Sequence, residues 1–318
     1  MIQNRIACIG DLLVEMMRPE VGDSLDKTGI FLGPYPSGAS GIFIDTIARL
    51  GLEALFIGAV GKDDFGAVIT NRLQEDGVDI SHIKVMDHYT TGVAFVTYFR
   101  DGSRKFIFHL AHAATGQIYP EDIDPGYLAN LSYLHVIGST LATNNNCAAA
   151  CFKAIECALE NGGKISFDPN FRPELITERE IRELFEPVIR KSQIVFPTQE
   201  EIAVLTGKSD LDAACKEILE MGPEIVAIKQ GKKGSTVYTV NDKYHVPAFD
   251  ITEVDPTGAG DCYCAGFLTA VLNGLSLKET AKFANAVGAL AVTKKGPMEG
   301  SPRYEEVAEF LKIAATSS

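Results

Sequence analysis

The chain of 318 residues contains no tryptophan, and its 29 lysines and arginines are outnumbered by 42 aspartates and glutamates. The formal net charge of -13 at pH 7 disfavours nucleic acid and anionic membranes as partners, because neutralising phosphate groups requires a basic surface. No apolar run reaches the roughly 20 residues that a membrane-spanning helix needs, and the first residues do not resemble a signal segment. We therefore expect a cytoplasmic protein whose partners are small molecules.

Common cofactor and metal motifs are also missing. None of the seven cysteines belongs to a Cys-x-x-Cys pair, so we expect all of them to be reduced packing residues. Gly10-Asp11-Leu12-Leu13 follows the first apolar run in place of Gly-x-Gly-x-x-Gly, which argues against a nicotinamide-dependent oxidoreductase. A Gly-x-x-x-x-Gly-Lys-Ser/Thr sequence is likewise missing, which excludes a P-loop NTPase.

Short apolar runs alternate with segments of helical periodicity along most of the chain. The expected strands are 5–10, 55–60, 133–138, 164–168, 194–197 and 224–229, and the expected helices are 40–51, 65–75, 145–161, 178–191 and 209–221. Three more helices are expected to begin near Gly258, Ser276 and Pro302. This alternation predicts an α/β fold with a mainly parallel sheet flanked by helices, and ligands that bind at the carboxyl ends of the strands.

Two stretches depart from this alternation. Residues 91–110 have the pattern of a β-hairpin that turns at Asp101-Gly102, and together with 12–17 and 31–36 they predict a small antiparallel β lid. We expect this lid to be inserted from approximately 11–36 and 90–112 into a single domain that spans 1–318. A second hairpin, formed by 235–240 and 244–247, is expected at an antiparallel edge of the main sheet.

The strongest local motif is Asp255 to Asp261, which reads Asp-Pro-Thr-Gly-Ala-Gly-Asp and opens an apolar helix. Its small residues allow close approach of a ligand, and free N–H groups at a helix start form a cradle for an anion such as phosphate. Asp261 stands in the first turn, where a carboxylate can accept a hydroxyl proton. The alternative interpretation is a glycine-rich helix cap in which Asp261 only complements the helix dipole.

This motif resembles the second motif of the ribokinase-like (PfkB) sugar kinases, whose pattern is Asp-Thr-x-Gly-Ala-Gly-Asp. The resemblance covers nearly the whole chain, and further segments follow in the family's order. They are Ser37-Gly38-Ala39 before Ala48-Arg49-Leu50-Gly51, Val60-Gly61-Lys62-Asp63-Asp64-Phe65-Gly66, Asp168-Pro169-Asn170-Phe171-Arg172, Lys229-Gln230-Gly231-Lys232-Lys233-Gly234, and Asn285-Ala286 through Lys295-Gly296. The resemblance implies a ribokinase-like fold and the transfer of the γ-phosphate of ATP to a sugar hydroxyl.

The resemblance also implies roles for individual residues. The amides of Gly258, Ala259 and Gly260 would hold the phosphate while Asp261 acts as the base. The nucleotide would lie against Lys229, Gly231, Gly234, Asn285, Thr198 and Asn170. Glu201 would organise Mg²⁺ through water, with Thr198 in place of the family's asparagine. The alternative interpretation is that Glu200 and Glu201 form a plain acidic first turn of a helix. A K⁺-like cation would be held near Asp255, Thr257, Ala291 and Gly296.

The sugar end departs further from the family pattern. Its expected ligands are Asp11, Glu15, Gly38, Ala39, Arg172 and His109, and Ile42 replaces an asparagine that usually contacts sugar hydroxyls. Residues 108–112 lack the arginine that sugar-acid kinases often carry there, which favours a neutral hexose or ketohexose such as fructose or tagatose. A 2-keto-3-deoxygluconate or other sugar-acid kinase, a nucleoside or vitamin kinase, and a non-catalytic sugar sensor remain alternatives. The resemblance also implies a homodimer through the lid.

Overall fold

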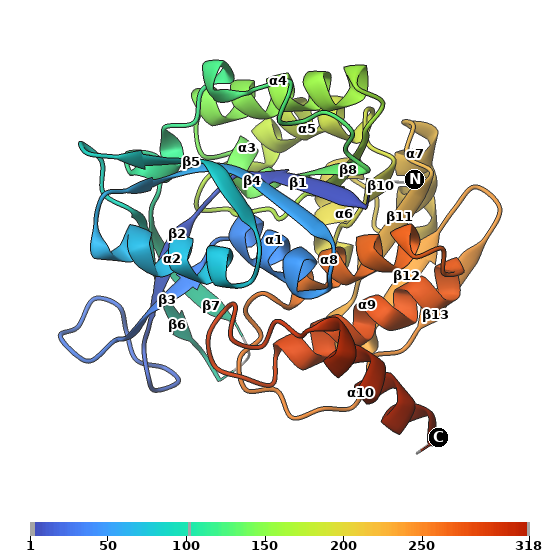
Figure 1. The fold of residues 1–318 in the computed structure, drawn as a ribbon. Helices are drawn as coiled ribbons and strands as arrows, with labels where there is room; N and C mark the ends of the chain where they lie inside the picture. Colours follow the sequence, from blue (N-terminus) through green and yellow to red (C-terminus); the bar gives the residue numbers. More distant parts are fainter. Residues whose placement is uncertain (1–3, 101–102, 317–318) are drawn as a thin grey trace.

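The main body is a nine-stranded sheet in a computed structural model that describes residues 4–100 and 103–316 (Figure 1). The strand order is β13-β12-β11-β10-β9-β8-β1-β4-β5. The strands are β1 (Arg5–Ile9), β4 (Glu53–Gly61), β5 (Asp79–Met86), β8 (Tyr133–Ile137), β9 (Lys164–Asp168), β10 (Ile194–Val195), β11 (Ile225–Lys229), β12 (Ser235–Tyr238) and β13 (Lys243–Val246). Pairing is parallel from β11 to β5 and antiparallel at β12 and β13, as predicted.

Helices cover both faces of this sheet (Figure 1). One face packs against α3 (Gly138–Leu141), α4 (Asn145–Glu160), α5 (Glu178–Ile189), α6 (Gln199–Thr206) and α7 (Leu211–Glu220). The other face packs against α1 (Ala39–Arg49), α2 (Asp64–Glu75), α8 (Ala259–Leu272) and α9 (Leu277–Ala291), with α10 (Tyr304–Thr316) beyond α9. Short 3-10 turns occur at η1 (Ala114–Gly116), η2 (Pro120–Asp122) and η3 (Gly231–Lys233). The predicted α/β class is therefore confirmed.

A second sheet of four strands forms the lid, in the order β3-β2-β6-β7. Its strands are β2 (Leu13–Met17), β3 (Leu32–Ser37), β6 (Gly92–Tyr98) and β7 (Arg104–His109). The outer pairs are antiparallel, whereas β2 and β6 pair in parallel. Both of these strands follow strands of the parallel main sheet, so they leave it in the same direction. The predicted turn at Asp101-Gly102 lies outside the described residues.

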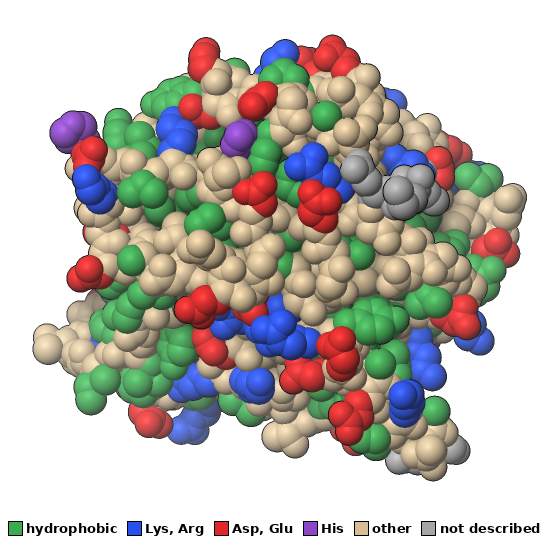
Figure 2. Space-filling model, in the orientation of Figure 1, with side chains coloured by type: hydrophobic (Ala, Val, Ile, Leu, Met, Phe, Trp, Pro, Cys, Tyr) green, Lys and Arg blue, Asp and Glu red, His purple; other side chains and the backbone are tan. Residues whose placement is uncertain are grey.

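Besides the 3-10 turns, β5, α3 and α6 were not among the expected strands and helices. Most residues of the edge strand β5 are exposed or half-buried, and α6 begins where a helix start at Glu201 was only the alternative interpretation. The seven cysteines are all free and buried, as expected. Among the described helices, none is both long and apolar enough to cross a membrane. On the face drawn in Figure 2, acidic and basic side chains are interspersed rather than gathered by sign.

Candidate functional site

A cavity of about 960 Å³ opens between the carboxyl ends of the parallel strands and the lid. Most of the predicted site residues line it, although they come from distant parts of the chain. They are Asp11, Glu15, Gly38, Ala39, Asn170, Arg172, Thr198, Glu201, Lys229, Gly231, Gly234, Thr257, Gly258, Ala259, Gly260, Asp261 and Asn285. The cavity is large enough for a nucleotide and a second small molecule.

The predicted anion cradle lies at the start of α8. Gly258 caps the helix with a φ of 82°, and a Cβ there would lie 2.6 Å from the carbonyl oxygen of Pro297, so glycine is required. The first bond of the helix runs from the Cys262 amide to the Gly258 carbonyl. Within the described part of the chain, the amides of residues 258–261 donate to no backbone carbonyl. These donors are free to bind an anion in the cavity.

Asp261 presents its carboxyl group to the same cavity, beside the cradle. Burial, with a further contribution from the negative charge of Asp168, raises the pKa of Asp261 to about 7. The Asn170 amide donates from Nδ2 to Asp261 Oδ1 over 3.3 Å, which fixes the orientation of the carboxyl group. A carboxyl group with a pKa near neutrality suits a general base.

A buried ion pair supports the segment that carries Asn170. Lys229 Nζ lies 2.5 Å from Asp168 Oδ2, and the side chains are 12% and 0% exposed. The other oxygen of Asp168 accepts from the Asn170 amide nitrogen at 3.1 Å, and Asn170 has a φ of 37°. Asn170 Oδ1 is buried and has no partner among the described residues. That atom can therefore accept a hydrogen bond from a ligand.

Glu201 links two neighbouring loops. Its two carboxylate oxygens accept from the backbone amides of Phe171 at 2.8 Å and Thr198 at 2.7 Å. Thr198 in turn caps α6, since its hydroxyl accepts from the Glu201 amide at 3.1 Å. Glu201 lines the cavity, and a carboxylate oxygen that accepts one hydrogen bond can accept another, which fits contact with hydrated Mg²⁺ through water. The helix-start interpretation of Glu201 is correct, and the Mg²⁺ role, which is compatible with it, stays a prediction.

The backbone is closely packed on the side of the cavity where the nucleotide is expected. Gly234 has a φ of 94°, and a Cβ there would lie 2.1 Å from the Val246 carbonyl oxygen, so no other residue fits. Asn285 donates from Nδ2 to the carbonyls of Val246 and Pro247, at 3.0 and 3.2 Å. The end of β13 is therefore the partner of this buried amide. Asn285 shapes the pocket wall while its N–H groups are already used.

At the sugar end, Asp11 is held firmly. Its oxygens accept from the Ala39 amide at 3.1 Å and from the hydroxyls of Ser40 at 2.9 Å and Thr140 at 3.1 Å. Gly38 permits this contact, because a Cβ there would lie 2.4 Å from the Asp11 carbonyl oxygen. Asp11 is thus a fixed acceptor at the start of α1.

Glu15 is held much more loosely than Asp11. It is 3% exposed, its Oε1 has no partner among the described residues, and its Oε2 lies 3.5 Å from the Ser37 hydroxyl. Burial, and to a lesser extent the charge of Asp255, raises the pKa of Glu15 to about 8. A buried carboxyl oxygen that faces a cavity without a partner indicates a ligand contact.

Ile42 has a packing role that explains part of its departure from the family pattern. It is 2% exposed and lies directly against Gly258, since a Cβ on that glycine would be 3.2 Å from Ile42 Cγ2. Ile42 belongs to the apolar cluster that also contains Cys262 and Met298. Through Ile42, this cluster packs against Gly258, the first residue of the cradle.

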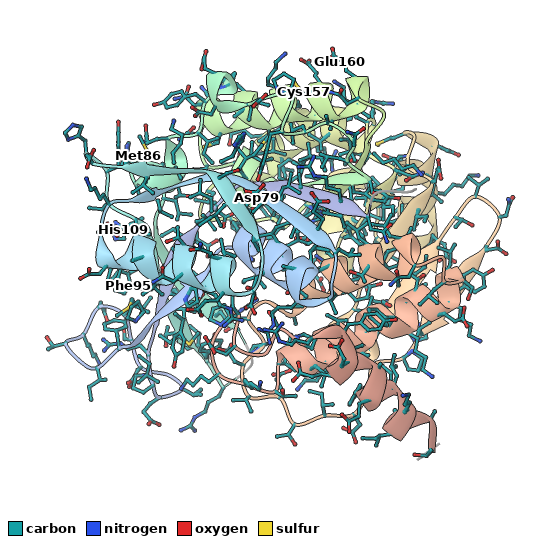
Figure 3. All side chains as sticks on the ribbon, viewed as in Figure 1. Asp79, Met86, Phe95, His109, Cys157 and Glu160 are labelled. Atoms are coloured by element: carbon teal, nitrogen blue, oxygen red, sulfur yellow. The ribbon has the colours of Figure 1, made fainter. Side chains whose placement is uncertain are left out.

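The prediction that His109 binds the substrate needs correction. Along β7, Arg104, Phe106 and Phe108 line the cavity, whereas His109 alternates to the opposite face of the lid. Its ring lies 6.1 Å from that of Phe95 on β6, edge to face (Figure 3). The homodimer through the lid stays a prediction.

Two residues near the site, Arg104 and Tyr98, were not predicted from the sequence. Arg104 lines the cavity from β7, four residues before the segment 108–112 in which an arginine was expected for a sugar acid, and its alternation with Phe106 and Phe108 is the signal that could have found it. Tyr98, at the end of β6, reaches across to the loop before the cradle. Its hydroxyl donates to Asp255 Oδ1 at 2.9 Å and lies 2.6 Å from Thr257 Oγ1.

Asp255 lies behind the cradle, outside the cavity lining. It accepts from the amides of Thr257 and Gly296, both at 3.0 Å, and is 3% exposed. The Ala291 carbonyl faces Gly300 closely, since a Cβ on that glycine would be 1.9 Å from the Ala291 oxygen. The described residues contain no group of three or more His, Cys, Asp or Glu side chains arranged to hold a metal ion. The predicted monovalent cation site therefore stays a prediction.

Comparison with known proteins agrees with this geometry. The model of the pfkB family carbohydrate kinases matches residues 3–303. "Probable fructokinase-2" of Arabidopsis thaliana is 30% identical, and the match covers 97% of this chain and 96% of that protein.

Solved structures give the same result. An E. coli protein described as a "putative Ribokinase II", in complex with ATP and Mg²⁺, is 39% identical with a TM-score of 0.92, over 97% of this chain and 99% of that one. A fructokinase double mutant from Vibrio cholerae O395, bound to fructose, ADP and potassium, is 28% identical with a TM-score of 0.86, over 97% and 98% of the two chains. The family match spans almost the whole sequence, and so this chain belongs to the pfkB carbohydrate kinases, which phosphorylate sugars with ATP.

Proposed function

We propose that the protein transfers the γ-phosphate of ATP to a hydroxyl of a ketohexose such as fructose or tagatose. The observation that carries this proposal is the free-amide cradle at residues 258–261 beside the Asp261 carboxyl group, both facing one cavity. The similarity to fructokinases supports the ketohexose.

Asp261 would act as the general base. In its ionised form it accepts the proton of the attacking hydroxyl as the new phosphate ester bond forms. The cradle amides would stabilise the negative charge that develops on the transferred phosphoryl group. Because the pKa of Asp261 is about 7, the reactive carboxylate is depleted as pH falls below 7.

Asp11 and Glu15 would orient the sugar by accepting or donating hydrogen bonds at its hydroxyls. Mg²⁺ would be held near Glu201 through water and would neutralise phosphate charge. A monovalent cation, K⁺ above all, would lie beside Asp255, behind the cradle. Asn170 Oδ1, which has no partner among the described residues, is available to a bound ligand or its water.

A sugar acid is the second candidate substrate. Residues 108–112 contain no arginine, but Arg104, which lies earlier on β7, lines the cavity, as does Arg172. Both guanidinium groups act on the buried Glu15 and lower its pKa, although burial has the larger effect. Two arginines at the sugar end would suit a carboxylate.

One substrate panel tests these proposals. ADP release is measured for fructose, tagatose, 2-keto-3-deoxygluconate, gluconate and two nucleosides, with and without Mg²⁺. We expect a ketohexose to give at least about tenfold higher kcat/KM than any other class, and turnover to require Mg²⁺. A sugar acid as best substrate would replace the ketohexose, and binding of a sugar without any ADP release would indicate a sensor.

A further inference from the structure

We propose that Lys229 is a positioning residue for the base: through Asp168 and Asn170 it sets the orientation of the Asp261 carboxyl group. This inference rests on the proposed function, because it assigns Asp261 to proton transfer. It differs from the role in nucleotide binding that the family resemblance implies for Lys229.

The first step is an ion pair at the carboxyl ends of β9 and β11, which lie on either side of β10. Lys229 is the last residue of β11 and Asp168 the last residue of β9, and their side chains meet at 2.5 Å in a nearly solvent-free position. A buried carboxylate without a cation would be strongly disfavoured. The ammonium group therefore holds the Asp168 carboxyl group in place.

The second step is the turn that follows β9. Asp168 Oδ1 accepts from the Asn170 amide nitrogen, two residues ahead, at 3.1 Å. This bond supports the left-handed conformation of Asn170, whose φ of 37° is uncommon for any residue other than glycine. The next amide, that of Phe171, is fixed separately by Glu201. The turn is thus held from two sides.

The third step is the contact with the base. Asn170 Nδ2 donates to Asp261 Oδ1 at 3.3 Å. Lys229 itself lies close to the cradle, since its Nζ would be 3.6 Å from a Cβ on Gly260. A described contact therefore joins each residue to the next along the series from Lys229 through Asp168 and Asn170 to Asp261.

The test uses the full chain with its best sugar from the panel. Wild-type turnover is established first, so that the proposed function stands or fails before any variant is made. Lys229→Met is expected to lower kcat at least about tenfold while KM for ATP changes less than about threefold. Asn170→Ala is expected to lower kcat in the same way but by less, and the double variant should match Lys229→Met instead of multiplying the two losses.

The pH dependence of kcat supplies a readout that a purely structural role would not move. The charged groups that face Asp261 are Asp168, Lys229, Arg172 and Asp11. Because the Lys229 cation favours ionised Asp261, its removal should move the acid limb from about pH 7 to higher pH. Lys229→Arg, which keeps the charge, should leave the limb in place.

Lys233→Met is the matched control, since that lysine is exposed and lies outside the cavity lining. A selective rise in KM for ATP in Lys229→Met, with kcat and the acid limb unchanged, would make Lys229 a nucleotide ligand and overturn the proposal. A double variant whose fall in kcat equals the product of the two single falls would also overturn it. Should Lys229→Met fail to fold, an unchanged kcat in Asn170→Ala, which keeps the ion pair, overturns it independently.

Discussion

The two ends of the cavity differ in how their charged side chains are satisfied. At the phosphate end, Lys229 is paired with Asp168, and Glu201 accepts from two backbone amides. At the sugar end, Glu15 is buried with one long contact to Ser37, its other oxygen has no partner among the described residues, and Arg104 is exposed on the lid. The charged groups named at the phosphate end are thus paired within the chain, whereas Glu15 and Arg104 at the sugar end are not held in this way. Substitutions should therefore affect chemistry at one end and substrate binding at the other.

The largest effect is expected from Asp261→Asn. An amide of the same shape keeps the contacts of the cradle but cannot accept the proton, so kcat should fall by about 10²–10⁴-fold. Affinity for ATP, measured by titration calorimetry, should stay within about threefold of wild type. An unchanged kcat would show that Asp261 is not the general base. The separation between chemistry at the phosphate end and substrate binding at the sugar end would then fail as well.

A smaller effect, confined to the other end, is expected from Glu15→Ala. Losing a buried hydrogen-bonding partner costs roughly 1–3 kcal/mol, so KM for the sugar should rise about 5- to 150-fold. KM for ATP should stay unchanged in the same steady-state assay. Glu15→Gln is the matched control, because at pH 7 the pKa of about 8 keeps Glu15 mostly neutral and glutamine resembles the neutral acid. Equal losses for alanine and glutamine would show that Glu15 binds the sugar as a carboxylate.

The smallest effect is expected from Arg104→Met. An exposed charge on the lid contributes little, so KM for a sugar acid should rise only about two- to fivefold, and KM for fructose should not change. Lys105→Met, which removes a positive charge from the opposite face of the same strand, is the control. A rise for fructose as large as that for the acid would mean that Arg104 acts through packing instead of charge.

Local patterns in the sequence predicted most elements of the fold correctly. The parallel strands are apolar runs of a few residues, and their order along the chain follows from alternation with helices. The strand β5 was not predicted because it lies at the sheet edge, where Ser81 and Lys84 interrupt the apolar pattern. The segment between residues 77 and 90 therefore resembled a loop.

The sequence predicted the part of the site that a short continuous motif forms, which is the cradle. It did not predict which face of a lid strand each side chain occupies, nor which residues far apart in the chain form ion pairs. A shift of one residue along β7 exchanges the faces of His109 and Phe108, so which of them faces the cavity depends on the pairing of β7 with β6. Lys229 and Asp168 are 61 residues apart, so nothing local signals that they form an ion pair.

The hydroxyl of Tyr98 joins the lid to the loop that precedes the cradle. A movement of β6 away from the main sheet would break both contacts of this hydroxyl, with Asp255 and with Thr257. Thr257 immediately precedes Gly258, so the position of the lid bears on the segment that leads into the phosphate-binding amides.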